Sequence, residues 1–182
     1  MRTLLCALLA LPLLAGPKVK LTTNLGPIVF ELQPDAAPRT VESFLVYVRR
    51  GQYNGTIFHR VVKAGGIVQG GGHTPTMAKR KTLPPTPHEG EQAKAKGLKH
   101  LRGTVALALP PGMPTGGTAQ FFINVKNNPS YDFKAKTLQG YGYTPFAKVV
   151  EGMAVVDKIA ASPVKGERPV KDVIIEKAEE VK

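Results

Sequence analysis

The chain has 182 residues, a single cysteine and a formal net charge of +12. This length suits one domain that buries about 70% of the surface of its unfolded chain, so the fold needs no disulfide or metal to hold it together. The lone Cys6 excludes an intramolecular disulfide, and the four histidines lack the spacing of a zinc site. We therefore expect neither a metal nor another cofactor.

The N-terminal residues have the three-part pattern of an export signal. Arg2 precedes an apolar run from Leu4 to Ala15, and the chain turns polar at Lys18. The run is well short of the ~20 residues that span a bilayer. We predict that residues 1–16 form a signal peptide, whose cleavage site the sequence does not define. Residues 17–182 then form one domain, without a membrane span, that works in the periplasm or outside the cell.

Much of the positive charge gathers in one loop-like region of the sequence. Its cationic residues are Lys79, Arg80, Lys81, Lys94, Lys96, Lys99 and Arg102. The charge permits nucleic-acid binding. A surface that binds nucleic acid interleaves its cations with aromatic residues that stack on the bases, and this region has no phenylalanine, tyrosine or tryptophan. We interpret it as a solvated basic loop and expect no specific nucleic-acid partner.

The first half of the chain alternates between strand and helix patterns. Polar and apolar residues alternate over 18–21 and again over 28–32, which predicts a hairpin with one buried side. Pro38 suits the first position of a helix, whose apolar residues recur with helical spacing until Gly51 ends it. Strands are predicted over 57–62 and 67–69, and the Pro- and Lys-rich segment 74–100 is predicted to be a long loop.

The second half consists mainly of short apolar runs. We predict strands over 104–109 and 121–125, separated by a turn-rich connection. A strand over 146–150 leads into a helix over 151–160, and 173–177 is the closing strand. Short strands at regular intervals, with one helix early and one late, predict an all-β-dominated antiparallel barrel with helices over its open ends.

Two polar residues occupy strands that are otherwise apolar, and a third directly precedes such a strand. From Phe58 to Gly72, two β-branched runs flank a glycine turn, with Arg60 in the first run and Gln69 in the second. Gln120 leads directly into the most apolar strand of the chain. An unpaired guanidinium or amide inside a sheet is costly, so each of these side chains must have a partner or face a cleft.

Five motifs resemble, in order and nearly in spacing, those of the cyclophilin peptidyl-prolyl isomerases. They are Phe58-His59-Arg60-Val61, Gln69-Gly70-Gly71, Gly103-Thr104 with Ala106 and Ala108, Gln120-Phe121-Phe122-Ile123, and Phe146-Ala147-Lys148-Val149. The run from Thr74 to Pro85 is similar to the bacterial exported branch of that family. The resemblance implies a closed eight-stranded antiparallel barrel capped by two α-helices. It also implies isomerisation of X-Pro bonds in proline-containing or unfolded exported proteins.

This reaction changes no covalent bond. An X-Pro bond rotates slowly because amide resonance must be broken, at a barrier of ~18–20 kcal/mol. A catalyst needs an apolar pocket for the proline ring and a donor that favours the twisted amide, whose nitrogen gains a lone pair, over the planar one. A fixed guanidinium is well suited, since it stays charged and keeps its geometry.

The resemblance assigns roles to ten residues. It implies that Arg60 is the donor, that Gln69 and Gln120 orient it and bind the substrate backbone, and that Phe122 is the pocket floor. It also implies substrate contacts from Phe58, His59, Ile67, Ala108, Tyr131 and Tyr143. Taken singly, Phe122 and Ile67 could be ordinary core residues, and Arg60 could simply pair with an acid. Taken together and in order, these residues favour the enzyme.

The sequence departs from the family pattern at the pocket wall. Gly66 stands where a phenylalanine is usual, Ser130 stands where a tryptophan or phenylalanine is common, and the segment between Arg60 and Gln69 is one residue longer. A lost aromatic wall removes apolar contact of ~1.5–3 kcal/mol if fully buried. A second hypothesis is therefore a weakly active or inactive chaperone that binds proline peptides. We also expect weak cyclosporin binding and a monomer.

Overall fold

The computed structural model describes residues 16–182. Apart from Gly16, the predicted signal peptide at residues 1–16 lies outside the described residues. No helix within 16–182 is long and apolar enough to cross a membrane.

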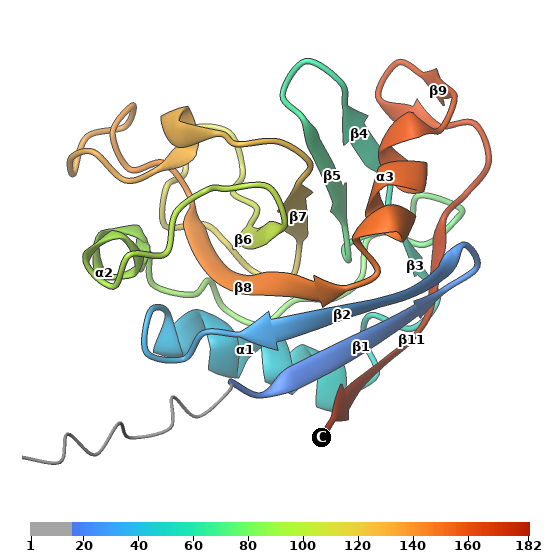
Figure 1. The fold of residues 1–182 in the computed structure, drawn as a ribbon, viewed down its shortest axis with the longest axis horizontal. Coiled ribbons are helices and arrows are strands. Elements are labelled where there is room, and N and C mark those ends of the chain that lie inside the picture. The colour runs from blue at the N-terminus through green and yellow to red at the C-terminus, as the bar shows by residue number, and fades with distance from the viewer. Residues whose placement is uncertain (1–15) are drawn as a thin grey trace, which may run out of the picture.

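The elements follow one another along the chain as short strands interrupted by helices (Figure 1). In order they are β1 (Lys18–Thr23), β2 (Gly26–Leu32), α1 (Pro38–Arg49), β3 (Thr56–Ile57), β4 (Arg60–Val62), β5 (Ile67–Gly70), α2 (Gly90–Ala95), β6 (Thr104–Leu107), β7 (Phe121–Asn124), a 3-10 turn (Pro129–Tyr131), β8 (Thr144–Glu151), α3 (Met153–Ala161), β9 (Val164–Lys165), β10 (Arg168–Pro169) and β11 (Ile174–Val181). The predicted early hairpin, early helix and late helix are confirmed.

The strands form a curled antiparallel sheet, but the prediction of a closed eight-stranded barrel was wrong. Nine strands pair in the order β3-β11-β1-β2-β8-β6-β7-β5-β4, so the sheet has two edges. The edge strands β3 and β4 are consecutive in the chain, because the predicted strand over 57–62 is broken at Phe58 and His59. There the Phe58 amide donates to the Val173 carbonyl at 2.9 Å outside any strand ladder. The two edges are therefore neighbours without being paired.

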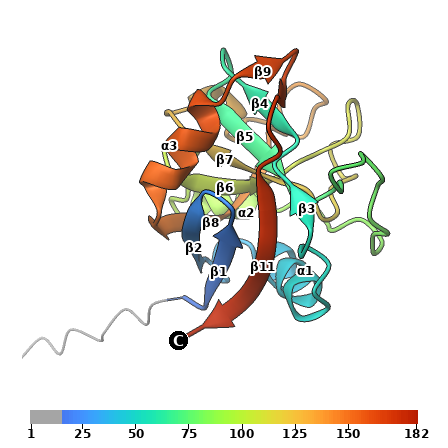
Figure 2. The same cartoon turned by 90° about the vertical axis from the view of Figure 1, so that its right-hand side faces the viewer.

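The main core fills the inside of this curl. Both views show α1 and α3 well apart from each other, each against the curled sheet (Figures 1 and 2). Phe44 of α1 lies 5.1 Å from Phe146 and 5.9 Å from Phe121, measured between ring centroids. Val156 and Ile159 of α3 belong to the same cluster of buried residues. The periodic apolar residues of both helices thus explain why each packs on the sheet.

The segment predicted to be a long loop contains a short helix, α2, and a buried carboxylate. Glu89 is 7% exposed and accepts hydrogen bonds from the Arg39 and Thr40 amides at 3.0 and 2.8 Å and from the Thr40 hydroxyl at 2.7 Å. Residue Ala37, which precedes α1, has no side chain that could cap the helix. Glu89 therefore caps the first turn of α1 from a distance of about fifty positions in the sequence.

Replacing Glu89 by alanine is expected to lower the free energy of unfolding by about 2–3 kcal/mol, because the buried amide and hydroxyl of Thr40 and the partly buried amide of Arg39 lose a charged acceptor. Glu91 is the matched control, since its side chain is 60% exposed and pairs only with exposed Lys136. Glu91→Ala should cost less than about 0.5 kcal/mol. Urea unfolding of both variants measures the difference, and equal losses would show that Glu89 does not cap α1.

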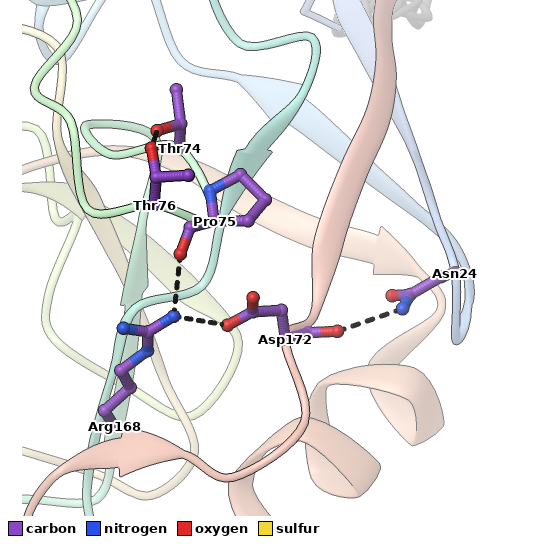
Figure 3. A network of polar contacts seen from close by, with 6 residues as sticks. All are labelled: Asn24, Thr74, Pro75, Thr76, Arg168 and Asp172. Carbon is purple, nitrogen blue, oxygen red and sulfur yellow. Dashed lines mark hydrogen bonds and ion pairs between the residues drawn. The ribbon is translucent and has the colours of Figure 1, made fainter.

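A polar network fixes the beginning of the same segment (Figure 3). Arg168 donates from Nη2 to the Pro75 carbonyl and to the Asp172 carboxylate, both at 2.9 Å. The Asn24 side chain, in the turn between β1 and β2, donates to the Asp172 carbonyl at 3.0 Å. Arg168 therefore holds Pro75 directly, and Asp172 and Asn24 support Arg168 from behind.

Candidate active site

Four neighbouring strands place a row of chemically distinct residues on one face of the sheet. Arg60 of β4 is opposite Gln69 of β5, Gln69 is opposite Phe122 of β7, and Phe122 is opposite Ala106 of β6. Directly paired residues point to the same face, and their neighbours along each strand point to the other. Accordingly, Val61, Val68, Phe121, Ile123 and Val105 belong to the main core. The row therefore lies on the outer face of the curl.

A separate apolar cluster surrounds Phe122 on this outer face. It contains Ile67, Ala106, Ala108 and Phe122, with partly buried Val62, Tyr131 and Tyr143 against it. A cavity of about 390 Å³ opens above it. Its lining residues are Arg60, Ile67, Gln69, Lys79, Ala108, Leu109, Pro110, Pro111, Gly116, Thr118, Gln120, Phe122 and Tyr143. We call this cavity the proline pocket, because an apolar floor of this kind suits a small ring.

A chain of hydrogen bonds orients Arg60 at the rim of the pocket. Arg60 donates from Nε to Glu167 at 2.6 Å and from Nη1 to the Gln69 side-chain oxygen at 3.2 Å. Gln69 in turn donates to the Gln120 side-chain oxygen at 2.9 Å. Among residues 16–182, Nη2 of Arg60 makes no hydrogen bond. The guanidinium is thus held by two of its nitrogens and retains donors for a ligand.

The glycines after β5 leave space for Gln120. A Cβ on Gly72 would lie 2.4–2.6 Å from the Gln120 side chain, which is closer than real Cβ atoms approach. Any other residue at position 72 would push Gln120 away from Gln69. The polar chain from Glu167 to Gln120 therefore depends on this close backbone approach.

A buried histidine supports Phe122 from below, and the sequence analysis missed it. The His100 ring stacks on the Phe122 ring at 5.9 Å and is 1% exposed. Its Nδ1 is 3.3 Å from the Asn124 side-chain amide, and its Nε2 is 3.4 Å from the Tyr143 carbonyl. Burial lowers the pKa of His100, and a neutral ring with its proton on Nε2 satisfies both contacts. His100 thus gives the pocket floor a fixed base.

Tyr143 lines the pocket, and Tyr131 packs against the apolar cluster beside it. Their rings lie 5.1 Å apart, and each packs edge-on against Phe122. Gly66, by contrast, lies in the turn between β4 and β5 with φ +60°, where the side chain of Lys126 covers it. A Cβ there would lie 2.5 Å from the Lys126 chain. The apolar wall therefore comes from Tyr143 and Ile67, and not from residue 66.

Two of the residues with implied substrate contacts lie neither in the pocket lining nor in the apolar cluster beneath it. Phe58 is 1% exposed and packs in the main core, 5.9 Å from Phe121. The His59 ring packs beside the His73 ring at a tilt of 59°, with ring centroids 4.5 Å apart. Both lie in the break between β3 and β4, outside the row of residues on the outer face. The other eight residues lie in the pocket lining or in the cluster beneath it.

The histidines predict a loss of stability in mild acid. Burial, together with His73, lowers the pKa of His59 to about 4, and burial is also the main cause of the lowered pKa of His73, His88 and His100. Between pH 6.5 and 4 the unfolded chain then binds more protons than the folded chain, so the free energy of unfolding should fall as the pH falls.

His59→Gln tests this prediction through one residue. Because His59 is partly exposed, we expect it to account for about 1–2 kcal/mol of the loss between pH 7 and pH 5. Denaturant titrations of the parent and of His59→Gln at both pH values measure it. The variant should have the flatter profile, and an unchanged profile would contradict the prediction.

The comparisons with known proteins agree with this geometry. The family model for cyclophilin-type peptidyl-prolyl cis-trans isomerases matches residues 18–180. The chain belongs to this family. Peptidyl-prolyl cis-trans isomerase B of Escherichia coli K12 is 47% identical over 159 residues, which cover 85% of this chain and 93% of that protein. The isomerase cyp18 of Streptomyces antibioticus is 46% identical over 165 residues, covering 88% and 96% respectively. This cyclophilin is therefore a peptidyl-prolyl cis-trans isomerase.

Solved structures have the same fold. A cyclophilin-type isomerase from Cryptosporidium parvum superposes with a TM-score of 0.71 at 25% identity, covering 91% of this chain and 98% of that chain. A second structure of that protein, obtained in the presence of the dipeptide Ala-Pro, has a TM-score of 0.70 at the same identity and covers 91% and 99%.

Proposed function

We propose that this cyclophilin accelerates rotation of X-Pro bonds in exported polypeptides, with Arg60 as the donor to the twisted amide. The observation that supports this most directly is the fixed guanidinium at the rim of an apolar cavity. Glu167 and Gln69 hold Arg60, while Phe122 and Ile67 supply the apolar surface for a proline ring. The structure of the C. parvum relative obtained with Ala-Pro is in line with a proline-containing ligand.

The roles follow from the chemistry of the rotation. In the planar amide the proline nitrogen is a poor acceptor, because its lone pair is delocalised. As the bond twists, the nitrogen becomes pyramidal and can accept a hydrogen bond from the free guanidinium nitrogen. Since this bond exists only near the transition state, it lowers the barrier without tightening ground-state binding. Gln69 and Gln120 hold the neighbouring backbone, and His100 holds the floor beneath the ring.

A refolding assay tests the proposed function. Residues 17–182 should accelerate the proline-limited phase of refolding of a model protein, and the acceleration should be catalytic at concentrations well below that of the refolding chain. A slow phase of unchanged rate, at any concentration of the cyclophilin, would reject the proposal.

The second candidate function is a chaperone that binds proline peptides with little turnover. It rests on the absence of a phenylalanine at the position of Gly66, which does not line the proline pocket. The aromatic cluster of Phe122, Tyr131 and Tyr143 favours the enzyme, because it restores an apolar wall from another segment of the chain. Retention of unfolded chains without acceleration would favour the chaperone.

Cyclosporin should bind weakly. Ser130 is exposed and offers no aromatic surface, and Gly66 faces Lys126 instead of the pocket. Calorimetric titration measures the affinity. If binding is tight, Tyr131 must supply the lost contact, and Tyr131→Ala should then abolish it.

We further propose export as a monomer, on the basis of the apolar run before Lys18. Fractionation of the native host should find the processed chain outside the cytoplasm, and gel filtration should place it at the mass of one chain. The intact leader on a cytosolic form would contradict export.

A further inference from the structure

A second cavity adjoins the proline pocket. Its volume is about 430 Å³, and it shares Arg60, Leu109, Pro110, Pro111 and Tyr143 with the first. The two cavities are therefore adjacent, with these five residues bordering both. We call the second one the flanking groove.

The flanking groove is formed by two loops that leave large apolar side chains exposed. Met113, from the connection between β6 and β7, is 57% exposed, and Leu138, from the segment before β8, is 59% exposed. Pro111 and Pro114 add further apolar surface to the lining. Exposed apolar side chains gathered at one cavity are typical of a binding surface.

The groove has room for a side chain and little charge to repel or attract one. Ser130 lines it with a small side chain, so space remains where a large residue would fill it. Arg60 is the only charged residue among its lining residues, and Glu167 already pairs with it. An apolar occupant is therefore favoured over a cationic one.

We propose that the flanking groove binds a large apolar side chain, such as phenylalanine or leucine, of the same polypeptide whose proline enters the proline pocket. This inference rests on the proposed function, because a chain whose proline fills the proline pocket passes the adjacent groove. An extended chain advances about 3.3–3.6 Å per residue, so the apolar residue lies within about three positions of the proline. The groove thus selects substrates by an apolar residue near the proline, whose own peptide bond is not isomerised.

Peptide titrations test this proposal. The host peptide has one proline among alanines, and six further peptides place a single phenylalanine one, two or three positions before or after the proline. At least one placement should bind about tenfold more tightly than the host, which corresponds to about 1.4 kcal/mol. The same peptide with proline replaced by alanine should lose this gain, because the two cavities are then no longer occupied together.

Variants assign the gain to the groove. The double variant Met113→Ser with Leu138→Ser should abolish the gain from phenylalanine, and Ser130→Trp should reduce it by filling the space. Val170→Ser is the matched control, since Val170 is 66% exposed and lines neither cavity. It should keep the full gain. All three changes affect exposed side chains, so the variants should fold as the parent does.

The outcomes separate the two proposals. Equal affinity of all seven peptides within about twofold, or a gain that survives in the double variant, would overturn the flanking groove. If the parent fails to isomerise the host peptide, the proposed function is overturned instead. The gain in affinity from phenylalanine can still be measured by titration in that case.

Discussion

Replacing Arg60 by alanine should lower the rate of isomerisation by about 10²–10³, or roughly 2.7–4 kcal/mol, while peptide affinity stays nearly unchanged. The reason is that the guanidinium contacts the proline nitrogen only when the amide is twisted. The effect thus belongs to the transition state and not to the bound ground state. Exchange spectroscopy measures the rate on a short X-Pro peptide, and a binding titration measures the affinity.

Two further variants show whether the effect depends on a fixed guanidinium. Arg60→Lys should recover little activity, because a flexible point charge does not reproduce the planar fork. Arg102→Ala is the matched control: its side chain is 45% exposed against 43% for Arg60, and it pairs with Asp157 as Arg60 pairs with Glu167. It should isomerise as fast as the parent. If Arg60→Ala does so too, Arg60 is not the catalytic donor.

Consecutive phenylalanines of β7 should respond differently to the same substitution. Phe121 is fully buried and packs edge-on against four aromatic rings of the core, namely those of Phe30, Phe44, Tyr53 and Phe58. Phe121→Ala should therefore lower the free energy of unfolding by about 3–5 kcal/mol. Its folded fraction should still bind proline peptides, because the residue points away from the pocket.

Phe122→Ala should weaken proline-peptide binding by about tenfold to a hundredfold, since the ring loses its apolar floor in the ground state and the transition state alike. Turnover at low peptide concentration should fall by the same factor as the affinity. Arg60→Ala, by contrast, should lower turnover and leave the affinity nearly unchanged. Urea unfolding and peptide titration of both phenylalanine variants measure the two effects. If Phe122→Ala binds as the parent does, the proline ring does not rest on Phe122.

The row of site residues across the sheet could be predicted because its polar residues stand out in, or next to, short apolar strands. Arg60 and Gln69 were conspicuous as polar residues in β-branched strands, and Gln120 leads directly into the most apolar strand, which contains Phe122. The structure pairs these strands so that Arg60, Gln69 and Phe122 share a face. The pattern of polar and apolar residues in each strand therefore indicated which side chains share a face, and the strand pairing decides which of them are neighbours.

The remaining parts of the site depend on contacts between distant segments. Glu167 lies 107 positions after Arg60, in a hairpin whose strands have only two residues each and leave no periodic signal. His100 ends a segment that was predicted to be a loop, and only the tertiary structure brings it under Phe122. Phe58 lies in the main core, at the break between β3 and β4. Its motif gives no sign of this break, so the sequence could not indicate which way its side chain points.

The most direct test of isomerisation is exchange spectroscopy on an Ala-Pro-containing peptide with residues 17–182 at catalytic concentration. We expect the cis and trans resonances to exchange many times faster than in the free peptide, where the interconversion takes tens to hundreds of seconds at about 25 °C. Unchanged exchange, with chemical-shift changes that show the peptide is bound, would contradict catalysis and leave a proline-binding chaperone as the function.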